Sequence, residues 1–224
     1  MDRTFEPGYA FIFDLDGVLV DTSQLHYLSW RDLARDFDYE LSESFNEKLK
    51  GVSRKECLEL ILSDAGVQAR EAEKEALAEK KNRLYLDRIA HMSEADLLPG
   101  VMEFLIGAAR VKIPMAIGSA SKNSEFILRS TGIRNFFKVI VDGNVVTRSK
   151  PDPEVFLTAG KMLGYPPKQC VVFEDSVKGI EAGCKAGMKV VALCGTVEYE
   201  QADLQFDSFE RFKAYEIVNW FSII

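Results

Sequence analysis

Short runs of β-branched and aromatic residues recur along this chain, and most are followed by a polar turn and a helical pattern. The runs are YAFIFD, MAIGS, KVIVD, CVVFED and KVVALC, each too short to be a helix. The helical patterns include KNSEFILRSTG, PDPEVFLTAGKMLG and SVKGIEAGCKAG, and LQFDSFERF predicts a last edge strand before a C-terminal helix. This alternation predicts an α/β fold, whose parallel sheet is covered on both faces and binds ligands at the carboxyl ends of its strands.

The segment between residues 23 and 97 breaks the alternation, because it shows helical periodicity and no convincing strand. Its first helix carries apolar side chains on one face, at Tyr27, Trp30, Leu33, Ala34 and Phe37. A second helix lies within LKGVSRKECLELILSDAG, and a third within REAEKEALAEKKNRLYLDRI, whose charges predict a mostly solvated face. A helical block between the first strand and the rest of the sheet predicts an inserted cap. We therefore expect a core of residues 1–21 and 98–224 and a helical cap domain of residues 22–97.

Composition limits the classes of partner. The chain has 224 residues, and its formal net charge of -7 argues against nucleic acid or an anionic membrane as a general partner. No apolar run is long enough to span a membrane. Cys57, Cys170, Cys184 and Cys194 lack metal-ligand spacing, and MDRTFEPGYAFIF does not resemble a signal peptide. We therefore expect reduced thiols in a cytoplasmic protein. We also expect a monomer, because the cap already covers the site.

Acidic residues gather at two strand ends. Asp14 and Asp16 are two apart at the end of the first strand, so their side chains leave the same face, and Gly17 allows a sharp turn. Glu174 and Asp175 end the strand CVVFED, at the same edge of a parallel sheet. Four acidic groups at one edge need a cation, and an all-oxygen ligand set favours Mg²⁺. Two carboxylates with different surroundings can also divide labour between a nucleophile and a proton shuttle.

A hydroxyl and an ammonium accompany this acidic edge. Ser119 ends the strand MAIGS, and Lys150 precedes Pro151 in the loop that follows KVIVDGNVV. Taken singly, Ser119 could be a helix cap or loop residue, and Lys150 a solvated surface charge. Together, at successive strand ends that face a metal, they predict a cradle for a phosphoryl group, whose charge must be neutralised during transfer.

This pattern of motifs resembles the haloacid dehalogenase superfamily of phosphotransferases. The similar residues are DLDGVLVDT, then Ser119, then Lys150 with Pro151, then Glu174 and Asp175, in that order over nearly the whole chain. The resemblance implies a Rossmann-like core with a helical cap.

The resemblance also implies roles for the acidic residues. Asp14 would form an aspartyl-phosphate, and Asp16 would act as general acid and base while lending its backbone carbonyl to Mg²⁺. Asp175, with Glu174, would complete the metal shell. The expected catalytic residues are therefore Asp14, Asp16, Ser119 and Lys150.

Motifs in the cap resemble the hexose-phosphate mutases of this superfamily. They are FNEKLKGVSRKE, QLHYLSW and KKN, joined by SASKN in the core. The resemblance implies a sugar-phosphate substrate that passes through a bisphosphate intermediate. Such a substrate needs a second anion site, for which Arg54 can donate two hydrogen bonds side by side. The expected substrate-binding residues are Thr22, His26, Trp30, Gly51, Val52, Ser53, Arg54, Lys81, Ala120, Ser121, Lys122 and Asn123.

Several of these residues also have structural interpretations. His26 and Trp30 share a helix face at i and i+4, which ordinary core packing produces as well. Thr22 could hydrogen-bond Asp16, cap the first cap helix, or do both. Lys80 or Asn82 could face the cleft in place of Lys81.

Two other functions fit the same motifs. A sugar-phosphate phosphatase would use the same core but admit water to the closed site. A binding or regulatory protein on this fold would have no reason to need both Asp14 and Asp16.

Overall fold

The structure is a computed structural model and describes residues 8–193 and 199–222. Its sheet has six strands, all parallel, in the order β3-β2-β1-β4-β5-β6. The strands are β1 (Ala10–Phe13), β2 (Met115–Gly118), β3 (Val139–Val141), β4 (Cys170–Glu174), β5 (Lys189–Leu193) and β6 (Leu204–Phe206). The parallel sheet and its last edge strand are confirmed. Cys194, which the sequence places at the end of the fifth run, lies outside the described residues.

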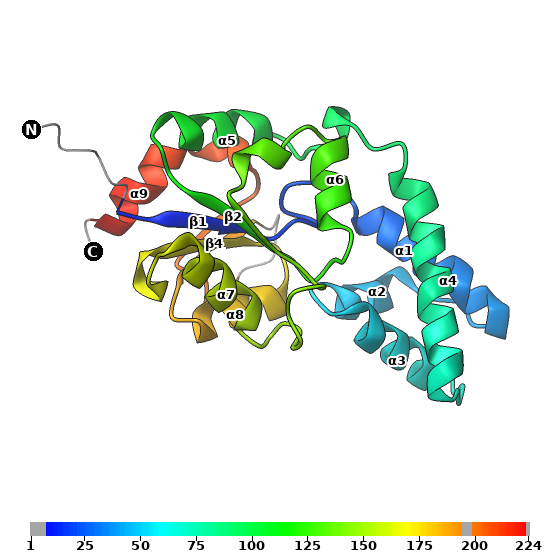
Figure 1. Ribbon diagram of the computed structural model, residues 1–224. Coiled ribbons are helices and arrows are strands. Elements are labelled where there is room, and N and C mark those ends of the chain that lie inside the picture. Colours follow the sequence, from blue (N-terminus) through cyan, green and yellow to red (C-terminus); the bar gives the residue numbers. More distant parts are fainter. Residues whose placement is uncertain (1–7, 194–198, 223–224) are drawn as a thin grey trace, which may run out of the picture.

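Helices cover both faces of the sheet (Figure 1). On one face lie α5 (Val101–Arg110) and α9 (Ala214–Ser222), and on the other α7 (Glu154–Leu163) and α8 (Val177–Lys185). The short α6 (Ser124–Ser130) follows β2. Helix α5 is an addition to the helices expected from the sequence, although its buried side chains recur at helical spacing.

The two central strands are buried on both faces because their residues alternate between two cores. Phe11 and Phe13 pack with Phe173 in an aromatic core beneath α5 and α9, and the Phe13 and Phe173 rings stack with centroids 4.6 Å apart. Ile12 joins a second core of smaller side chains beneath α7 and α8. The register pairs Phe13 with Phe173, so the residues that follow them, Asp14 and Glu174, lie side by side.

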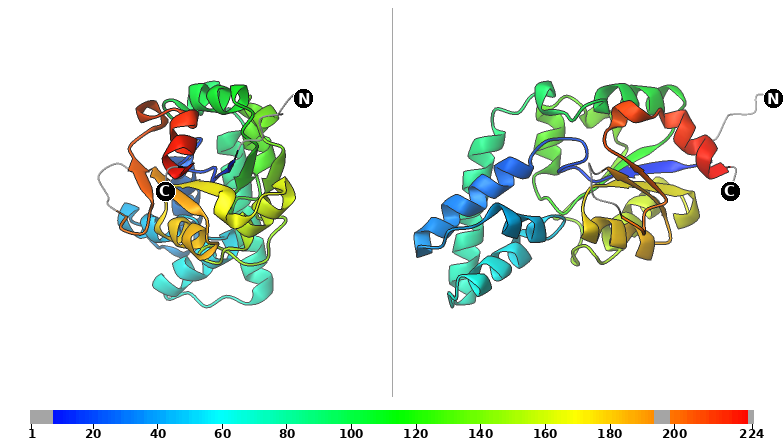
Figure 2. Two further views of the ribbon diagram at one scale, coloured as in Figure 1. Left: turned by 90° about the vertical axis from the view of Figure 1, so that its left-hand side faces the viewer. Right: turned by 180° about the vertical axis from the view of Figure 1, so that it is seen from behind.

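A separate group of helices stands beyond the carboxyl ends of the strands (Figures 1 and 2). It contains α1 (Ser23–Ala34), α2 (Glu43–Asn46), α3 (Arg54–Asp64) and α4 (Glu71–Ile89). These helices share a core of their own, in which Trp30, Leu33 and Ile61 are buried. The inserted helical cap is thus confirmed, and α2 is an addition to the three expected helices.

The two chain segments that join cap and core run side by side. The amide of Asp21 donates to the carbonyl of Asp96 at 3.1 Å, and Val20 forms an isolated antiparallel bridge with Leu97. The domain limits at residues 21/22 and 97/98 stay a prediction.

The expectations about membrane spans, cysteines and oligomeric state have different outcomes. No helix in the described ranges is long and apolar enough to cross a membrane. Cys57, Cys170 and Cys184 are free thiols, and Cys194 lies outside the described residues. The monomeric state stays a prediction.

Candidate active site

Lys150 is the centre of a buried charge cluster. Its Nζ lies 2.6 Å from Oδ1 of Asp14 and also pairs with Oε1 of Glu174, and only 2% of the residue is exposed. Burial favours the neutral amine, but the two carboxylates outweigh it and raise the pKa of Lys150. The interpretation of Lys150 as a solvated surface charge is therefore wrong.

Three carboxylates form a candidate metal site around this lysine. Ligand atoms of Asp14, Glu174 and Asp175 all lie within 4.8 Å of one another. Burial, followed by repulsion from Glu174, raises the pKa of Asp175 to about 7. Burial also raises the pKa of Asp14; Lys150 opposes this, and the neighbouring carboxylates reinforce it. Three acids facing one lysine leave excess negative charge in a buried space, and this hard-oxygen donor set fits Mg²⁺.

Glu174 already uses both of its carboxylate oxygens. Oε1 receives Lys150, while Oε2 accepts from the amides of Asp175 and Ser176 at 2.9 and 3.0 Å and from the Ser176 hydroxyl at 3.0 Å. A Cβ at Gly179, in the first turn of α8, would collide with this carboxylate. Asp14 and Asp175 therefore have more lone pairs to offer a cation than Glu174 has.

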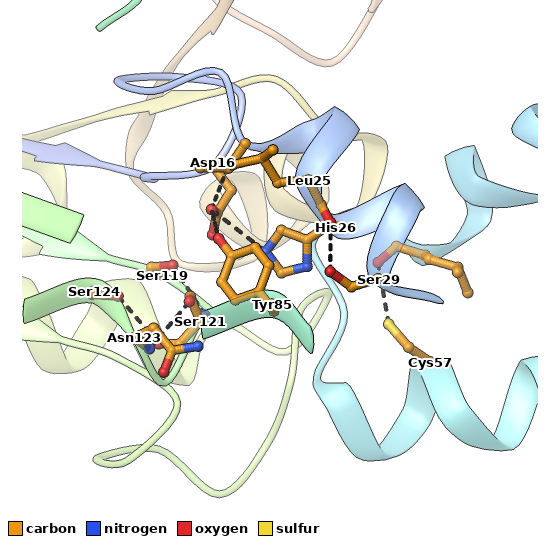
Figure 3. Close-up of polar contacts among 12 residues, drawn as sticks. Asp16, Leu25, His26, Ser29, Cys57, Tyr85, Ser119, Ser121, Asn123 and Ser124 are labelled. Atoms are coloured by element: carbon orange, nitrogen blue, oxygen red, sulfur yellow. Dashed lines mark hydrogen bonds and ion pairs between the residues drawn. The ribbon is translucent and has the colours of Figure 1, made fainter. Parts of the chain in front are cut away.

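The carboxylate of Asp16 is not among the three grouped carboxylates, so the metal role expected for Asp16, through its backbone carbonyl, stays a prediction. The Asp16 carboxylate accepts a hydrogen bond from the Thr22 hydroxyl and one from Tyr85 at 3.4 Å, and Nε2 of His26 is 3.6 Å away (Figure 3). Burial alone would raise the pKa of Asp16, but the contacts with His26 and Thr22 outweigh it and lower the pKa. Asp16 is thus ionised at neutral pH and held on the cap side of Asp14.

Thr22 helps to hold the Asp16 carboxylate in this position. It occupies the N-cap position of α1, but its side chain makes no capping hydrogen bond and donates to Asp16 instead. Of the two roles considered for Thr22, the structure has the contact with Asp16.

A second polar chain connects α1 with α4. Nζ of Lys81 lies 3.0 Å from Nδ1 of His26, and the ammonium sits between the rings of Trp30 and Tyr85, 4.7 and 4.6 Å from their centroids. A protonated Lys81 can only donate, so we assign Nδ1 of His26 as the acceptor; a neutral His26 then carries its proton on Nε2, toward Asp16. Burial, followed by the charge of Lys81, lowers the pKa of His26 and favours that neutral form.

The residues flanking Lys81 face elsewhere. Lys80 forms an ion pair with Asp36 inside the cap, and Asn82 accepts a hydrogen bond from Asn123 of the core. Lys81 is the cleft-facing lysine, as expected, although Asn82 also reaches toward the core.

Lys81 should make stability depend on pH. Burial lowers its pKa from 10.5 to about 7, so between these values the unfolded chain binds the extra proton. Stability should therefore rise with pH across this window, by up to about 1.4 kcal/mol per pH unit. Urea unfolding of Lys81→Met should lack this rise. Lys161→Met, which replaces an exposed lysine on α7, is the control and should retain it; equal slopes in both variants would contradict the account.

A pocket of about 380 Å³ lies between cap and core. Most of the expected site residues line it; Thr22 lies behind Asp16, and Glu174 lies beneath Lys150. Gly51, at φ +71°, brings the cap turn against the core, where an added Cβ would meet the Ser176 hydroxyl oxygen at 2.7 Å. The cap is therefore closed over the acidic cluster.

The pocket is rich in cations although the chain is acidic. Its lining includes Lys50, Arg54, Lys55, Lys81, Lys122, Arg148 and Lys150. Arg54 begins α3 and forms no ion pair within the described residues, and burial lowers its pKa. An arginine held at a pocket wall without a carboxylate is suited to bind an anion from solution.

The loop after β2 forms the opposite wall. The Ser119 hydroxyl accepts from the amide of Ser121 at 3.1 Å, and the Ser121 hydroxyl accepts from the amide of Asn123 at 3.2 Å (Figure 3). Both hydroxyl protons can still be donated toward the pocket. Ala120 and Lys122 lie between these residues and also line the pocket.

Sequence reasoning missed Tyr85, which holds Asp16 and packs against the His26 ring at 4.1 Å. The charges of the surrounding segment predict a mostly solvated helix, which hides the buried position of Tyr85. Its spacing from Lys81 and Ile89, four residues on either side, marks the inward face of α4 and could have identified it. Lys50 and Cys57 in the cap were also missed as pocket-lining residues.

A family model described as haloacid dehalogenase-like hydrolase matches residues 11–193, which contain the whole candidate site. The chain belongs to the haloacid dehalogenase-like family. It is therefore an enzyme of that superfamily, with the Rossmann-like core and helical cap described above.

Relatives within the haloacid dehalogenase-like family include a mutase and a phosphatase. A beta-phosphoglucomutase of Bacillus subtilis (strain 168) is 41% identical over 186 residues, which are 82% of each chain. A phosphorylated carbohydrates phosphatase of Thermotoga maritima is 29% identical, over 94% of this chain and 96% of its own. The crystal structure of a beta-phosphoglucomutase from Clostridium difficile matches with a TM-score of 0.92 and 37% identity, over 96% of this chain and 97% of that one.

Proposed function

We propose that the protein is a Mg²⁺-dependent β-phosphoglucomutase, which interconverts β-D-glucose 1-phosphate and glucose 6-phosphate. The observation that carries the proposal is the pocket itself, whose lining has two parts: cationic residues that include Arg54 of the cap and Lys122 of the loop after β2, and the acidic residues Asp14 and Asp175. A substrate with phosphates at two ends needs both parts. Similarity to mutases of B. subtilis and C. difficile, at 41% and 37% identity, supports this proposal.

Asp14 is the proposed nucleophile. It lies at the end of β1 with one carboxylate oxygen held by Lys150, so attack on phosphorus would come from the other oxygen. Attack would form an aspartyl-phosphate and break the bond from phosphorus to the sugar oxygen, which would take a proton from Asp16 and leave as a hydroxyl, while Lys150 and Ser119 would contact the transferring group. When bound, Mg²⁺ would be held by Asp14, Asp175 and the Asp16 carbonyl, with Glu174 beside them, and would offset the charge of the phosphoryl oxygens.

Asp16 is the proposed proton shuttle. Its lowered pKa keeps it ionised, so it can take the proton of the sugar 6-hydroxyl as the phosphoryl group leaves Asp14. In the return step, Asp16 gives that proton to the 1-oxygen while the phosphoryl group of the bisphosphate passes back to Asp14. Thr22, Tyr85 and His26 fix the carboxylate for both steps.

The bisphosphate must turn over between the two steps, with one phosphate bound away from Asp14 each time. Arg54 from the cap and Ser121, Lys122 and Asn123 from the core would bind that distal phosphate. Closure of the cap turn at Gly51 against Ser176 would keep water from the aspartyl-phosphate and favour transfer to a sugar.

Arg54→Ala should separate the two phosphate sites. We expect sugar-phosphate isomerisation to lose about 10- to 100-fold in kcat/KM, because a charge-assisted hydrogen-bonding partner of the distal phosphate is removed. Phosphorylation of Asp14 by acetyl phosphate, which has no distal phosphate, should change little. Arg83→Ala, which removes an exposed arginine of the cap helix α4 outside the pocket lining, is the control. Equal losses in both assays would remove Arg54 from the distal site.

Dependence on a bisphosphate primer tests the proposal. Isomerisation of β-glucose 1-phosphate should begin with a lag that trace glucose 1,6-bisphosphate removes, because only the bisphosphate loads Asp14 efficiently. Turnover without any such dependence would contradict a phosphoenzyme mutase cycle.

A sugar-phosphate phosphatase is the second candidate, favoured by the T. maritima relative that covers 94% of this chain. The same Asp14 and Asp16 would serve, with water in place of the sugar hydroxyl. Stoichiometric release of inorganic phosphate would identify it.

A further inference from the structure

A side-chain hydrogen bond joins a cap residue outside the pocket lining to a core residue of the proposed distal phosphate site. Nδ2 of Asn123 donates to Oδ1 of Asn82 at 3.1 Å. Asn82 lies on α4 of the cap, and Asn123 immediately precedes α6 of the core. Asn123 lines the pocket, whereas Asn82 lies behind it.

The backbone of Asn123 is fixed without the cap. Its amide donates to the Ser121 hydroxyl at 3.2 Å, and its carbonyl accepts from Ile127 at 3.1 Å as α6 begins. Its side chain makes no capping hydrogen bond. Within the described residues, Asn82 is the hydrogen-bonding partner that orients the Asn123 carboxamide.

The main chain of the preceding residue, Lys122, is held by a hydrogen bond from within the core. Nδ2 of Asn144 donates to the carbonyl of Lys122 at 3.0 Å, and Asn144 is itself held by Asp142. The main chain of this wall is therefore set by the core, while the carboxamide of Asn123 is set by the cap.

We propose that Asn82 is a positioning residue for the distal phosphate site, acting through Asn123. This inference rests on the proposed function, because it concerns the phosphate that is not being transferred. Closure of the cap places Asn82 against Asn123, holds the carboxamide at the pocket wall, and leaves its second Nδ2 hydrogen for the phosphate. Because closure of the cap strengthens binding of the distal phosphate in this arrangement, binding of that phosphate stabilises the closed cap by the same free energy, since coupling is reciprocal.

A double-mutant cycle tests whether Asn82 acts through Asn123. Wild type, Asn82→Ala, Asn123→Ala and the double variant are compared by their KM for β-glucose 1-phosphate. Asn82→Ala should raise KM about fivefold, as loss of one hydrogen bond would, and the double variant should match Asn123→Ala alone. The rate of Asp14 phosphorylation by acetyl phosphate should stay within about twofold. Independent, multiplicative effects in the cycle, or an equal loss with acetyl phosphate, would overturn the inference.

Lys80→Ala is the matched control, because it removes a polar contact of α4 that stays inside the cap. Its KM should equal that of wild type, and melting temperatures should exclude a general loss of folding. If wild type releases phosphate and forms no isomer, the proposed function fails by itself. The cycle is then measured by inhibition of acetyl phosphate hydrolysis by glucose 6-phosphate. Changes in the inhibition constant that do not multiply across the cycle would uphold the role of Asn82. Independent, multiplicative changes, or absence of inhibition, would overturn it.

Discussion

Asp14→Asn is expected to lower turnover of the sugar phosphate by at least about 10⁴-fold. The amide has nearly the shape of the carboxylate but cannot form an acyl-phosphate. The fold should persist, because the substitution removes one of three crowded negative charges whose proximity contributes to the raised pKa of Asp14.

The measurement is the mass of the intact protein after incubation with acetyl phosphate and Mg²⁺, alongside a turnover assay. Wild type should gain one phosphoryl group, and Asp14→Asn should gain none. Asp21→Asn is the matched control, since Asp21 lies in the same acidic run but is exposed. Phosphorylation of Asp14→Asn at wild-type yield would show that another residue is the nucleophile.

Asp16→Asn is expected to lower isomerisation by about 10²- to 10⁴-fold, the usual contribution of a positioned proton shuttle. A sugar alkoxide is a poor leaving group and needs the proton that Asp16 supplies. Acetate is a good leaving group and does not, so phosphorylation of Asp14 by acetyl phosphate should fall much less.

The comparison of the two phosphoryl donors separates proton transfer from damage to the site. Thr22→Val is the matched control, because it keeps the Asp16 carboxylate and removes only the hydroxyl that holds it. Its loss should be smaller than that of Asp16→Asn. Equal losses of Asp16→Asn with both donors would show that Asp16 supports the metal site or the fold rather than proton transfer.

Much of the fold follows from local sequence patterns. Runs such as CVVFED are short and rich in apolar residues, so a strand buried on both faces can be predicted from composition and length, and Cys170–Glu174 is buried throughout. That Asp14 and Glu174 reach the same edge of the sheet follows from parallel pairing, but their side-by-side placement also depends on β1 and β4 being neighbours in this register. The four-residue helix α2 could not be predicted from the sequence, because so short an element shows too little periodicity.

The orientation of Asp16 could not be predicted, because it depends on contacts across the fold. Thr22 immediately precedes α1, His26 lies on α1 and Tyr85 on α4, and only packing of the cap helices brings them to one carboxylate. The burial of Lys81 has the same origin, since the rings of Trp30 and Tyr85 that cover it lie on different helices. Local patterns predicted the acidic strand ends of the core and the existence of the helical cap, whereas the substrate-binding residues of the cap were expected only from resemblance.

Measuring two products in one reaction distinguishes a mutase from a phosphatase. The protein is mixed with β-glucose 1-phosphate, Mg²⁺ and trace glucose 1,6-bisphosphate, and glucose 6-phosphate and inorganic phosphate are measured in the same samples. We expect rapid formation of glucose 6-phosphate with little release of phosphate. Release of phosphate without isomerisation would contradict the proposed function and make the protein a phosphatase.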